Sequence, residues 1–391
     1  MHIFSQSPTD PAFVQNPYPV YDKIRGNFLY WKNYEIPAIF VYDEIDKLFR
    51  NKLLGREAIN SGEVNIPKRL KPFYDIEAHS MLELEPPRHT HLRKMVLHAF
   101  TSRRIAALGP EIENLCQKLI DKFPNDSFDI LSTYATQVPV IVIARLLGVP
   151  ESMTSQLLRW SNDMVMMYQA RRTPELEHQA VTSAIEFSSF METYIEERRN
   201  KPADDLISHL IAAEEDGARL SKDEVITTCI LLLNAGHEAT VHTLGNGIKA
   251  LIEHGADPAW FTPDAIASTV EEILRYDPPL HMFTRYVYDD VKIGDHVLSR
   301  GDQVALMIGA SGRDPNRWDD PNRFDPTRKV QKNHAFGAGI HFCLGAPLAR
   351  MEMQIALKAL FDRHPKLRIS AAPKYANVYH FHGLEALWVQ T

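Results

Sequence analysis

One cysteine of this sequence is placed where chemistry can be done. Cys343 belongs to the segment FGAGIHFCLG, which runs from Phe336 to Gly345 and contains three glycines. Glycine lets the backbone of such a loop come close to a flat ligand, and Pro347 predicts that a helix starts directly after it. The dipole of that helix shifts a nearby thiol toward the thiolate. The glycine framing favours a metal-bound thiolate; a small buried hydrophobic side chain is the alternative.

The other two cysteines offer no such pattern. The chain holds three cysteines in all, and Cys116 and Cys229 lie far from Cys343 with no C-x-x-C anywhere. An odd and sparse cysteine count predicts a reducing compartment without a disulfide framework. We therefore expect Cys116 and Cys229 to be core residues.

Two short motifs resemble known sites without meeting their spacing. His237 and His242 are five residues apart, so on a helix they point ~140° away from each other. A zinc-protease helix needs its histidines at i and i+4. The segment from Gly337 to Gly339 lacks the third glycine and the strand–helix context of a dinucleotide site. The spacing therefore excludes both zinc and dinucleotide binding at these motifs.

A long helix is predicted to position polar groups near the middle of the chain. Ser221 and Glu224 form a capping box, and no proline follows before about Glu253. The segment from Asn234 to Thr240 inserts a glycine and polar side chains into this leucine-rich pattern. Two interpretations stay open: a continuous helix that tolerates its glycine, or a backbone distortion that opens a pocket.

A second helix carries a pair of opposite charges. The pattern begins at Thr262-Pro263 and ends at Asp277-Pro278-Pro279, and it places Glu272 and Arg275 three residues apart on one face. Taken alone, this spacing is typical of a surface ion pair.

Composition and periodicity set the fold class. The 391 residues carry 43 Lys and Arg against 50 Asp and Glu, hence a net charge of −7, with 45% hydrophobic residues. These values exclude disordered and fibrous classes and give no basic footprint for nucleic acid. Helical periodicity dominates from about residue 101 to 253, and strand patterns lie near the ends. We expect one domain over residues 1–391, mainly α, with a small β-rich lobe from about 25–60, 285–310 and 370–391.

No segment of the sequence suggests a membrane or export. The longest apolar run, from Val138 to Ala144, is far shorter than the ~18 residues that a span needs. The first residues contain no apolar block of the kind found in a signal peptide. We expect a cytoplasmic monomer.

The order of these motifs along nearly the whole chain resembles the cytochrome P450 family, the haem-thiolate monooxygenases. The resemblance implies the cytochrome P450 fold, with haem b buried between the long distal helix and the proximal cysteine loop. Cys343 would be the axial thiolate ligand, in a loop with Phe336, Gly337 and Gly345. Thiolate ligation favours O–O cleavage, and without a C-x-x-C-H sequence the haem would carry no thioether links.

The resemblance also assigns the remaining motifs. Glu272 and Arg275 match the ExxR pair of the family, and Arg323 matches the third member of a buried salt-bridge triad, which we expect to be structural. Ala235, Gly236 and Glu238 match the oxygen-binding groove. The haem propionates require cationic partners, and four residues match these positions: His89, Arg93, Arg285 and His341.

One residue departs from the family pattern. The family usually has Thr directly after the distal acid, where its hydroxyl helps to deliver protons to dioxygen, but here Ala239 follows Glu238. Thr240 comes one residue later, ~100° further around the helix. Proton delivery would then depend on Glu238 with ordered water, on Thr240, or on a substrate hydroxyl. The departure also leaves open a peroxide-using or rearranging enzyme of the same fold. A non-catalytic haem sensor is the alternative from another class, with His237 as its candidate second ligand.

Substrate and partners follow from the resemblance as expectations. The positions expected to face the substrate are apolar with a few polar side chains, which suits a medium-sized apolar molecule with one oxygen function: Asn234, Leu280, His281, Phe283, Phe381 and His380. Electrons would come from a separate ferredoxin and an NAD(P)H-dependent reductase. We expect an acidic ferredoxin to dock on basic residues near the cysteine side: Arg88, Arg93, Lys94, Arg103, Arg104 and Arg350.

Overall fold

The chain divides into two compact units, each assembled from several segments of sequence. The computed structural model describes residues 2–26, 28–59, 66–168, 172–215, 218–379 and 381–391. Unit 1 comprises residues 1–55, 109–138 and 239–391, and unit 2 comprises residues 56–108 and 139–238. Because the chain passes between the units several times, the division does not test the expectation of a single domain. No helix within the described residues is long and apolar enough to cross a membrane.

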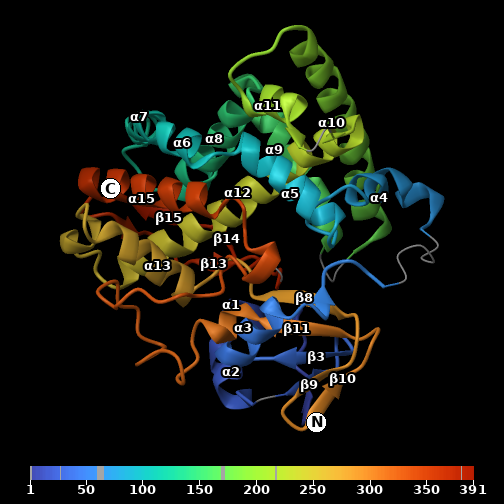
Figure 1. Ribbon diagram of the computed structural model, residues 1–391. Helices are drawn as coiled ribbons and strands as arrows, with labels where there is room; N and C mark the ends of the chain where they lie inside the picture. The colour runs from blue at the N-terminus through green and yellow to red at the C-terminus, as the bar shows by residue number, and fades with distance from the viewer. Residues whose placement is uncertain (1, 27, 60–65, 169–171, 216–217, 380) are drawn as a thin grey trace. The chain divides into compact units, whose positions relative to one another are not determined.

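A six-stranded mixed sheet forms the β-rich part of unit 1 (Figure 1). Its order is β1-β2-β3-β11-β8-β4, with parallel pairs β1/β2 and β3/β11 and antiparallel pairs elsewhere. The strands are β1 (His2–Phe4), β2 (Leu29–Trp31), β3 (Ile36–Ile39), β4 (Leu54–Gly55), β8 (Met282–Val287) and β11 (Gln303–Met307). The register opposes Arg285 to Val304 and Phe283 to Leu306. Between these two strands the chain forms a separate antiparallel pair, β9 (Val291–Ile293) and β10 (His296–Leu298).

Smaller sheets near the C-terminus complete the β structure of unit 1. One has the order β12-β15-β5 and another pairs β13 with β14. Their bounds are β5 (Phe128–Asp129), β12 (Arg368–Ile369), β13 (Lys374–Tyr375), β14 (Leu384–Ala386) and β15 (Trp388–Gln390). Most strands of unit 1 lie within or next to residues 25–60, 285–310 and 370–391. Neither β1 nor β5 was expected from the sequence, because strands of two or three residues are too short to show a period.

Two hydrophobic clusters hold the sheet to its helices in unit 1. The first gathers Phe4, Phe13, Trp31 and Phe40, all buried. The second packs Ile45 and the other apolar residues of α3 against buried residues of β8 and β11. The helices and the π-helical turn η2 of this unit are α1 (Pro11–Gln15), α2 (Tyr18–Ile24), α3 (Tyr42–Arg50), α7 (Gly109–Ile120), η2 (Leu131–Ala135), α13 (Ile266–Tyr276), α14 (Ile308–Ser311) and α15 (Ala346–Arg363).

Unit 2 is built of helices apart from one short hairpin. Its longest complete helix, α10 (Pro174–Asn200), packs on α9 (Thr154–Val165) through buried aromatic side chains such as Trp160 and Phe187, whose rings stack 5.0 Å apart. The other elements are α4 (Lys71–Glu77), α5 (Arg88–Ala99), α6 (Ser102–Ala107), α8 (Gln137–Leu147), α11 (Leu206–Ala212), β6 (Glu214–Glu215) and β7 (Ala218–Arg219). Helices therefore dominate the chain, as its periodicity predicted.

Helix α12 (Lys222–Glu253) is the long helix expected from the sequence. The capping box is formed: the Ser221 amide donates to Glu224 Oε2 at 2.8 Å, and the Glu224 amide donates to Ser221 Oγ at 3.2 Å. The helix is α-helical at every residue, including Asn234 to Thr240. The interpretation of a backbone distortion there is therefore wrong, and the continuous helix is correct. A Cβ added at Gly236 would lie 3.5 Å from Ile143, an ordinary van der Waals contact, so packing does not require glycine there.

Candidate functional site

The cysteine loop of unit 1 presents a thiol at the start of helix α15. Cys343 is exposed, and its amide donates to the carbonyl of Phe336 at 3.0 Å, which closes the loop. Gly337 and Gly339 have φ of +67° and +73°, a conformation that L side chains rarely adopt. A Cβ at Gly339 would lie 2.2 Å from the carbonyl oxygen of Phe49. The glycines are thus required by the backbone, and the loop holds a thiol before a helix N-terminus, where thiolate is favoured.

Arg350 ties the cysteine loop to helix α13. Its guanidinium lies 4.5 Å from the centre of the Phe336 ring and forms an ion pair with Glu271. The pairing fixes the first turns of α15 against α13. It also neutralises part of the charge that Arg350 was expected to offer to a ferredoxin.

Arg285 and Phe283 lie on the same strand, β8. Arg285 is buried, donates to the carbonyl of Thr284 at 2.8 Å and places its guanidinium 5.0 Å from the Phe49 ring centre. Phe283 is half-buried, and its ring meets Phe49 edge-on at 6.0 Å. His341 lies half-buried in the short 3-10 turn Gly339–His341. Unit 1 therefore brings a cation and an aromatic residue of the predicted site to one strand.

Helix α12 carries the expected distal residues of unit 2. Ala235 is exposed although Leu232 and Leu233 beside it are buried. His237 is fully buried, and its Nδ1 lies 2.8 Å from the carbonyl oxygen of Leu233. The Glu238 carboxylate is one-fifth exposed and approaches His237 Nε2 at 3.5 Å. The imidazole of His237 is thus buried, bonded to its own helix and packed beside the Glu238 carboxylate.

The residues after Glu238 on the same helix belong to unit 1. Thr240 is buried, and the hydroxyl of Thr243 donates to the carbonyl of Ala239 at 2.7 Å. That carbonyl is therefore occupied within the helix. The methyl group of Ala239 supplies no hydrogen-bonding group at the position where the family usually has a hydroxyl.

Three further predicted residues belong to unit 2. His89 and Arg93 lie one turn apart on α5, the first buried and the second half-buried. Asn234 donates to Met164 Sδ at 3.7 Å, while its side-chain oxygen is buried and accepts no hydrogen bond from the described residues. A buried carbonyl oxygen without a donor is costly. Asn234 is thus suited to accept a hydrogen bond from a ligand.

The buried salt bridge forms, but its third member differs from the prediction. Arg275 donates to both carboxylate oxygens of Glu272 at 2.7 Å, and both side chains are buried. Arg323 contributes only its carbonyl oxygen, 3.0 Å from Arg275 Nη2, and its side chain is 67% exposed. Arg328, 14% exposed, approaches Glu272 Oε2 at 3.6 Å. The assignment of Arg323 is therefore wrong, because the loop turns its side chain outward and brings Arg328 inward.

His281 is also placed differently from the expectation. Its ring is fully buried, with Nδ1 3.1 Å from the Tyr21 hydroxyl and Nε2 3.5 Å from the Tyr18 hydroxyl. It is therefore engaged by protein groups and does not line a substrate pocket. Its neighbour Leu280 is half-buried and pairs with Phe381 through an isolated β-bridge, so these two predicted pocket residues do meet. His380 lies outside the described residues.

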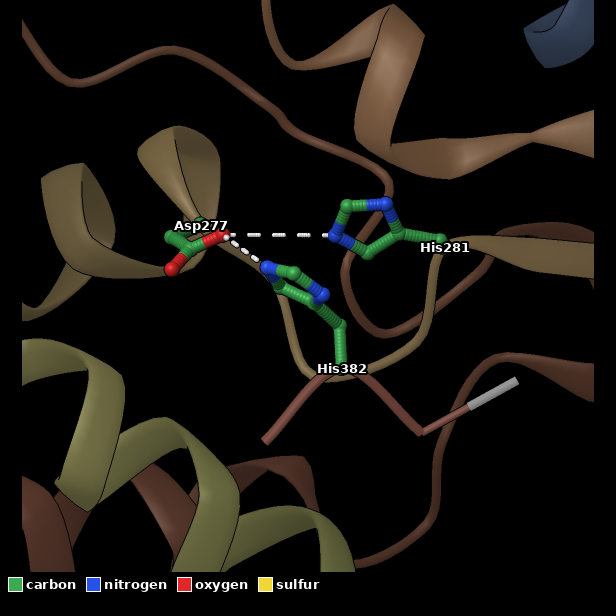
Figure 2. Close-up of side chains that lie close together, drawn as sticks. All are labelled: Asp277, His281 and His382. Atoms are coloured by element: carbon green, nitrogen blue, oxygen red, sulfur yellow. Dashed lines mark ion pairs between the residues drawn. The ribbon is translucent and has the colours of Figure 1, made fainter. Parts of the chain in front are cut away.

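Figure 2 shows a buried cluster that the sequence did not reveal, in which His281 and His382 approach Asp277. The distances to Asp277 Oδ1 are 4.0 Å from His281 Nε2 and 3.4 Å from His382 Nε2. His382 lies 105 positions after Asp277, so no local spacing pattern could have predicted the cluster. Burial lowers the pKa of His382 to about 3 and holds that of His281 well below its usual value, so both rings are neutral.

Comparison with known proteins now decides the family. The family model described as Cytochrome P450 matches residues 21–255 and 266–365. The chain belongs to the cytochrome P450 family. The P450 is similar to the polyketide biosynthesis cytochrome P450 PksS of Bacillus subtilis, at 36% identity over 97% of each chain. It is also similar to the 6-deoxyerythronolide B hydroxylase of Saccharopolyspora erythraea, at 37% identity over 82% of this chain and 78% of the relative.

Solved structures agree with the family assignment. The crystal structure of P450BioI, in complex with an acyl carrier protein ligated to hexadec-9Z-enoic acid, matches with a TM-score of 0.91 and 29% identity. The match covers 97% of this P450 and 99% of that chain. The protein is a cytochrome P450 monooxygenase with the mainly helical P450 fold and small β-sheets, as the sequence motifs predicted.

The place of Arg328 beside the buried Glu272–Arg275 ion pair can be tested by substitution. Replacing Arg328 by Met leaves the buried Glu272 carboxylate with one cation fewer and should lower the free energy of unfolding by about 1–3 kcal/mol. Arg323→Met is the matched control, because its exposed side chain should cost less than about 0.5 kcal/mol. Urea unfolding of the purified holoenzyme, followed by circular dichroism, measures both. Equal losses in the two variants would restore Arg323 as the third member.

Proposed function

We propose that this P450 inserts one oxygen atom from O2 into a medium-sized apolar substrate, using haem b ligated by Cys343. The observation that carries the proposal is the exposed thiol before helix α15, in a loop that two positive-φ glycines hold open. A flat cofactor fits such a loop, because glycine leaves no side chain in its way. Burial raises the pKa of Cys116 to about 12 and raises that of Cys229 further, so both remain protonated thiols. Cys343 is therefore the cysteine suited to ligation.

The haem propionates would be held by His89, Arg93, Arg285 and His341. Bound haem supplies the activation of dioxygen, for which thiolate ligation is suited. The geometry of Arg285 supports a role in binding a propionate. Its guanidinium is held on a central strand and against the Phe49 ring, which pre-organises it for a carboxylate. Phe336, Gly337 and Gly345 would shape the proximal face of the pocket.

Proton delivery on the distal side would depend on Glu238. Its carboxylate is partly exposed and lies 3.5 Å from Nε2 of the buried His237 ring. Ala239 cannot hold a proton, and the backbone carbonyl at this position already accepts from Thr243. Ala235 is exposed and Gly236 carries no side chain. Ordered water, Thr240 or a substrate hydroxyl would complete the relay from Glu238.

The substrate class that fits is an apolar acyl or polyketide molecule with an oxygen function. Asn234 presents a buried amide oxygen suited to a donor, while Leu280, Phe283 and Phe381 are apolar. Two relatives are named for polyketide biosynthesis and for hydroxylation of 6-deoxyerythronolide B. The similar P450BioI was crystallised in complex with an acyl carrier protein. A peroxide-using or rearranging enzyme is the second candidate, favoured by the absence of a hydroxyl at Ala239.

Electrons would come from a separate ferredoxin and its NAD(P)H-dependent reductase, with the P450 acting in the cytoplasm as a monomer. Arg88 and Lys94 are exposed on α5, and Arg93 and Arg104 are half-buried. Arg104 is already paired with Asp204 at 3.3 Å, just as Arg350 is with Glu271. Because their side chains are exposed, Arg88 and Lys94 are suited to contact an acidic ferredoxin.

Removal of the axial thiol tests the proposal itself. Cys343→Ala should abolish the ferrous–CO Soret band that is characteristic of thiolate ligation, because no other exposed cysteine is available among the described residues. Cys116→Ala is the control and should keep the band. A thiolate spectrum that survives in Cys343→Ala contradicts the assignment.

The hydroxyl missing at position 239 gives a second test. Ala239→Thr should raise the fraction of NADH electrons that appear in product rather than in peroxide, with the substrate taken from a spin-state binding screen. Glu238→Gln should lower that fraction, because the amide cannot supply a proton. If both variants behave as the wild type, the relay through Glu238 is wrong. Turnover with peroxide alone, at the rate supported by ferredoxin and NADH, would favour the second candidate function.

Docking of ferredoxin should depend on salt. The rate of P450 reduction by an acidic plant-type or bacterial ferredoxin should fall at least about tenfold between 0.05 and ~0.5 M NaCl, because salt screens exposed charges. Lys94→Gln should reduce both the rate and its salt dependence, whereas Lys374→Gln on the C-terminal hairpin should change neither. Rates that ignore ionic strength contradict a charged docking face.

A further inference from the structure

The buried cluster around Asp277 joins segments of unit 1 that are far apart in sequence. Both carboxylate oxygens are occupied: Tyr18 donates to Oδ1 at 2.6 Å and Tyr375 donates to Oδ2 at 2.5 Å. His382 Nε2 lies 3.4 Å from Oδ1, and its ring stacks on Tyr375 at 3.9 Å. We call the residues Tyr18, Asp277, His281, Tyr375 and His382 the Asp277 hub.

The hub lies next to two residues of the expected substrate pocket. Leu280 directly precedes His281, Phe381 directly precedes His382, and Leu280 and Phe381 are joined by a β-bridge. The backbone around them is also tied down, because the His382 amide donates to the Pro279 carbonyl at 2.8 Å. Each hub histidine therefore anchors the segment that carries one apolar pocket residue.

Further contacts leave this arrangement little freedom. Asn246 of helix α12 donates to the carbonyl oxygens of His382 at 2.8 Å and Asp277 at 3.3 Å. A Cβ at Gly383 would lie 1.8 Å from His242 Nδ1, and one at Gly309 would lie 2.7 Å from His281 Nδ1. Glycine leaves room for the His242 ring beside Gly383, the residue after His382, and for the His281 ring beside Gly309. The main chain next to His382 and the side chain of His281 are therefore each packed against a distant element.

Two histidines and a carboxylate are also a common donor set for divalent metals. Here the Tyr18 hydroxyl already lies 2.6 Å from Asp277 Oδ1 and 3.5 Å from His281 Nε2, where an ion would have to enter. Tyrosine hydroxyl groups donate to both carboxylate oxygens of Asp277. The cluster is therefore a closed hydrogen-bonded hub and not an open set of metal ligands.

We propose that the Asp277 hub positions Leu280 and Phe381 and thereby sets which bulky ligands this P450 accepts. The proposal rests on the proposed haem site, because these two residues are assigned to its distal side by resemblance. The hub residues are positioning residues: they touch no substrate and act through the segments that they hold. A buried carboxylate that loses one of its donors must find another, and the segment on which the donor lies then shifts.

Tyr375→Phe and Tyr18→Phe test the proposal by removing one hydroxyl each while keeping the ring. The control is Tyr134→Phe, which also removes one buried hydrogen bond, from Tyr134 to the Ala356 carbonyl at 2.8 Å, outside the hub. The probes are imidazole, too small to reach past the haem, and the bulky azole econazole, both titrated into holoenzyme by absorption. Imidazole binding to wild type shows whether the haem site itself is present.

The expected result is a change in ligand selection without loss of the haem. In the two hub variants the Kd of econazole should change at least about tenfold, equivalent to ~1.4 kcal/mol, while that of imidazole stays within about twofold. Tyr134→Phe should change neither. Amide hydrogen exchange of holoenzyme should quicken at His382 and Ala376 in Tyr375→Phe and not in Tyr134→Phe.

Three outcomes would overturn the proposal. The first is an econazole-to-imidazole Kd ratio that is unchanged in both hub variants although imidazole binds wild type normally. The second is an equal change of that ratio in Tyr134→Phe, which would mean a general loss of stability. The third is stoichiometric zinc in purified wild type that is lost in His382→Gln, which would make the cluster a metal site. Failure of imidazole to bind wild type would instead refute the proposed haem site.

Discussion

The fully buried charge of Arg275 is the constraint around which much of unit 1 is arranged. An uncompensated buried charge costs several kcal/mol, so a buried guanidinium must have both an anion and enough acceptors. Glu272 provides the anion, and the carbonyl oxygens of Gly312, Pro321 and Arg323 complete the acceptors at 2.7–3.0 Å. The Asp325 amide donates back to Glu272 at 2.8 Å. The irregular segment from Gly312 to Arg328 is therefore folded around one ion pair.

That segment leads directly to the cysteine loop, which explains why a charge far from any ligand matters for the site. A Cβ at Gly312 would lie 2.2 Å from the Arg275 carbonyl, so the chain passes close over the end of α13. The neighbouring Glu271 on the same helix pairs with Arg350 of α15, just beyond Cys343. Helix α13 thus holds the chain both before and after the thiol, and a loop without regular structure is kept in one position.

The sequence predicted best what local rules determine. The capping box at Ser221, the end of α13 at Asp277 and the glycine-framed loop before α15 each depend on neighbouring residues, and all were found where expected. Arg323 was misassigned because the choice between it and Arg328 depends on which side chain an irregular loop turns inward. No periodicity encodes that direction. His281 was misplaced for a similar reason, since its partners Tyr18 and Tyr21 lie 260 or more positions away.

The two sides of the predicted haem site differ in what their backbone allows to vary. At Gly339 a side chain would collide with the Phe49 carbonyl and demand a disfavoured φ, so chemistry and backbone impose the same residue. At position 239 the helix is regular, and its carbonyl bonds to Thr243 whatever the side chain is. The backbone therefore places no requirement on the side chain at this position. For that reason the absence of a hydroxyl at Ala239 bears on the proposed proton relay, whereas the glycines of the loop are already required by its backbone.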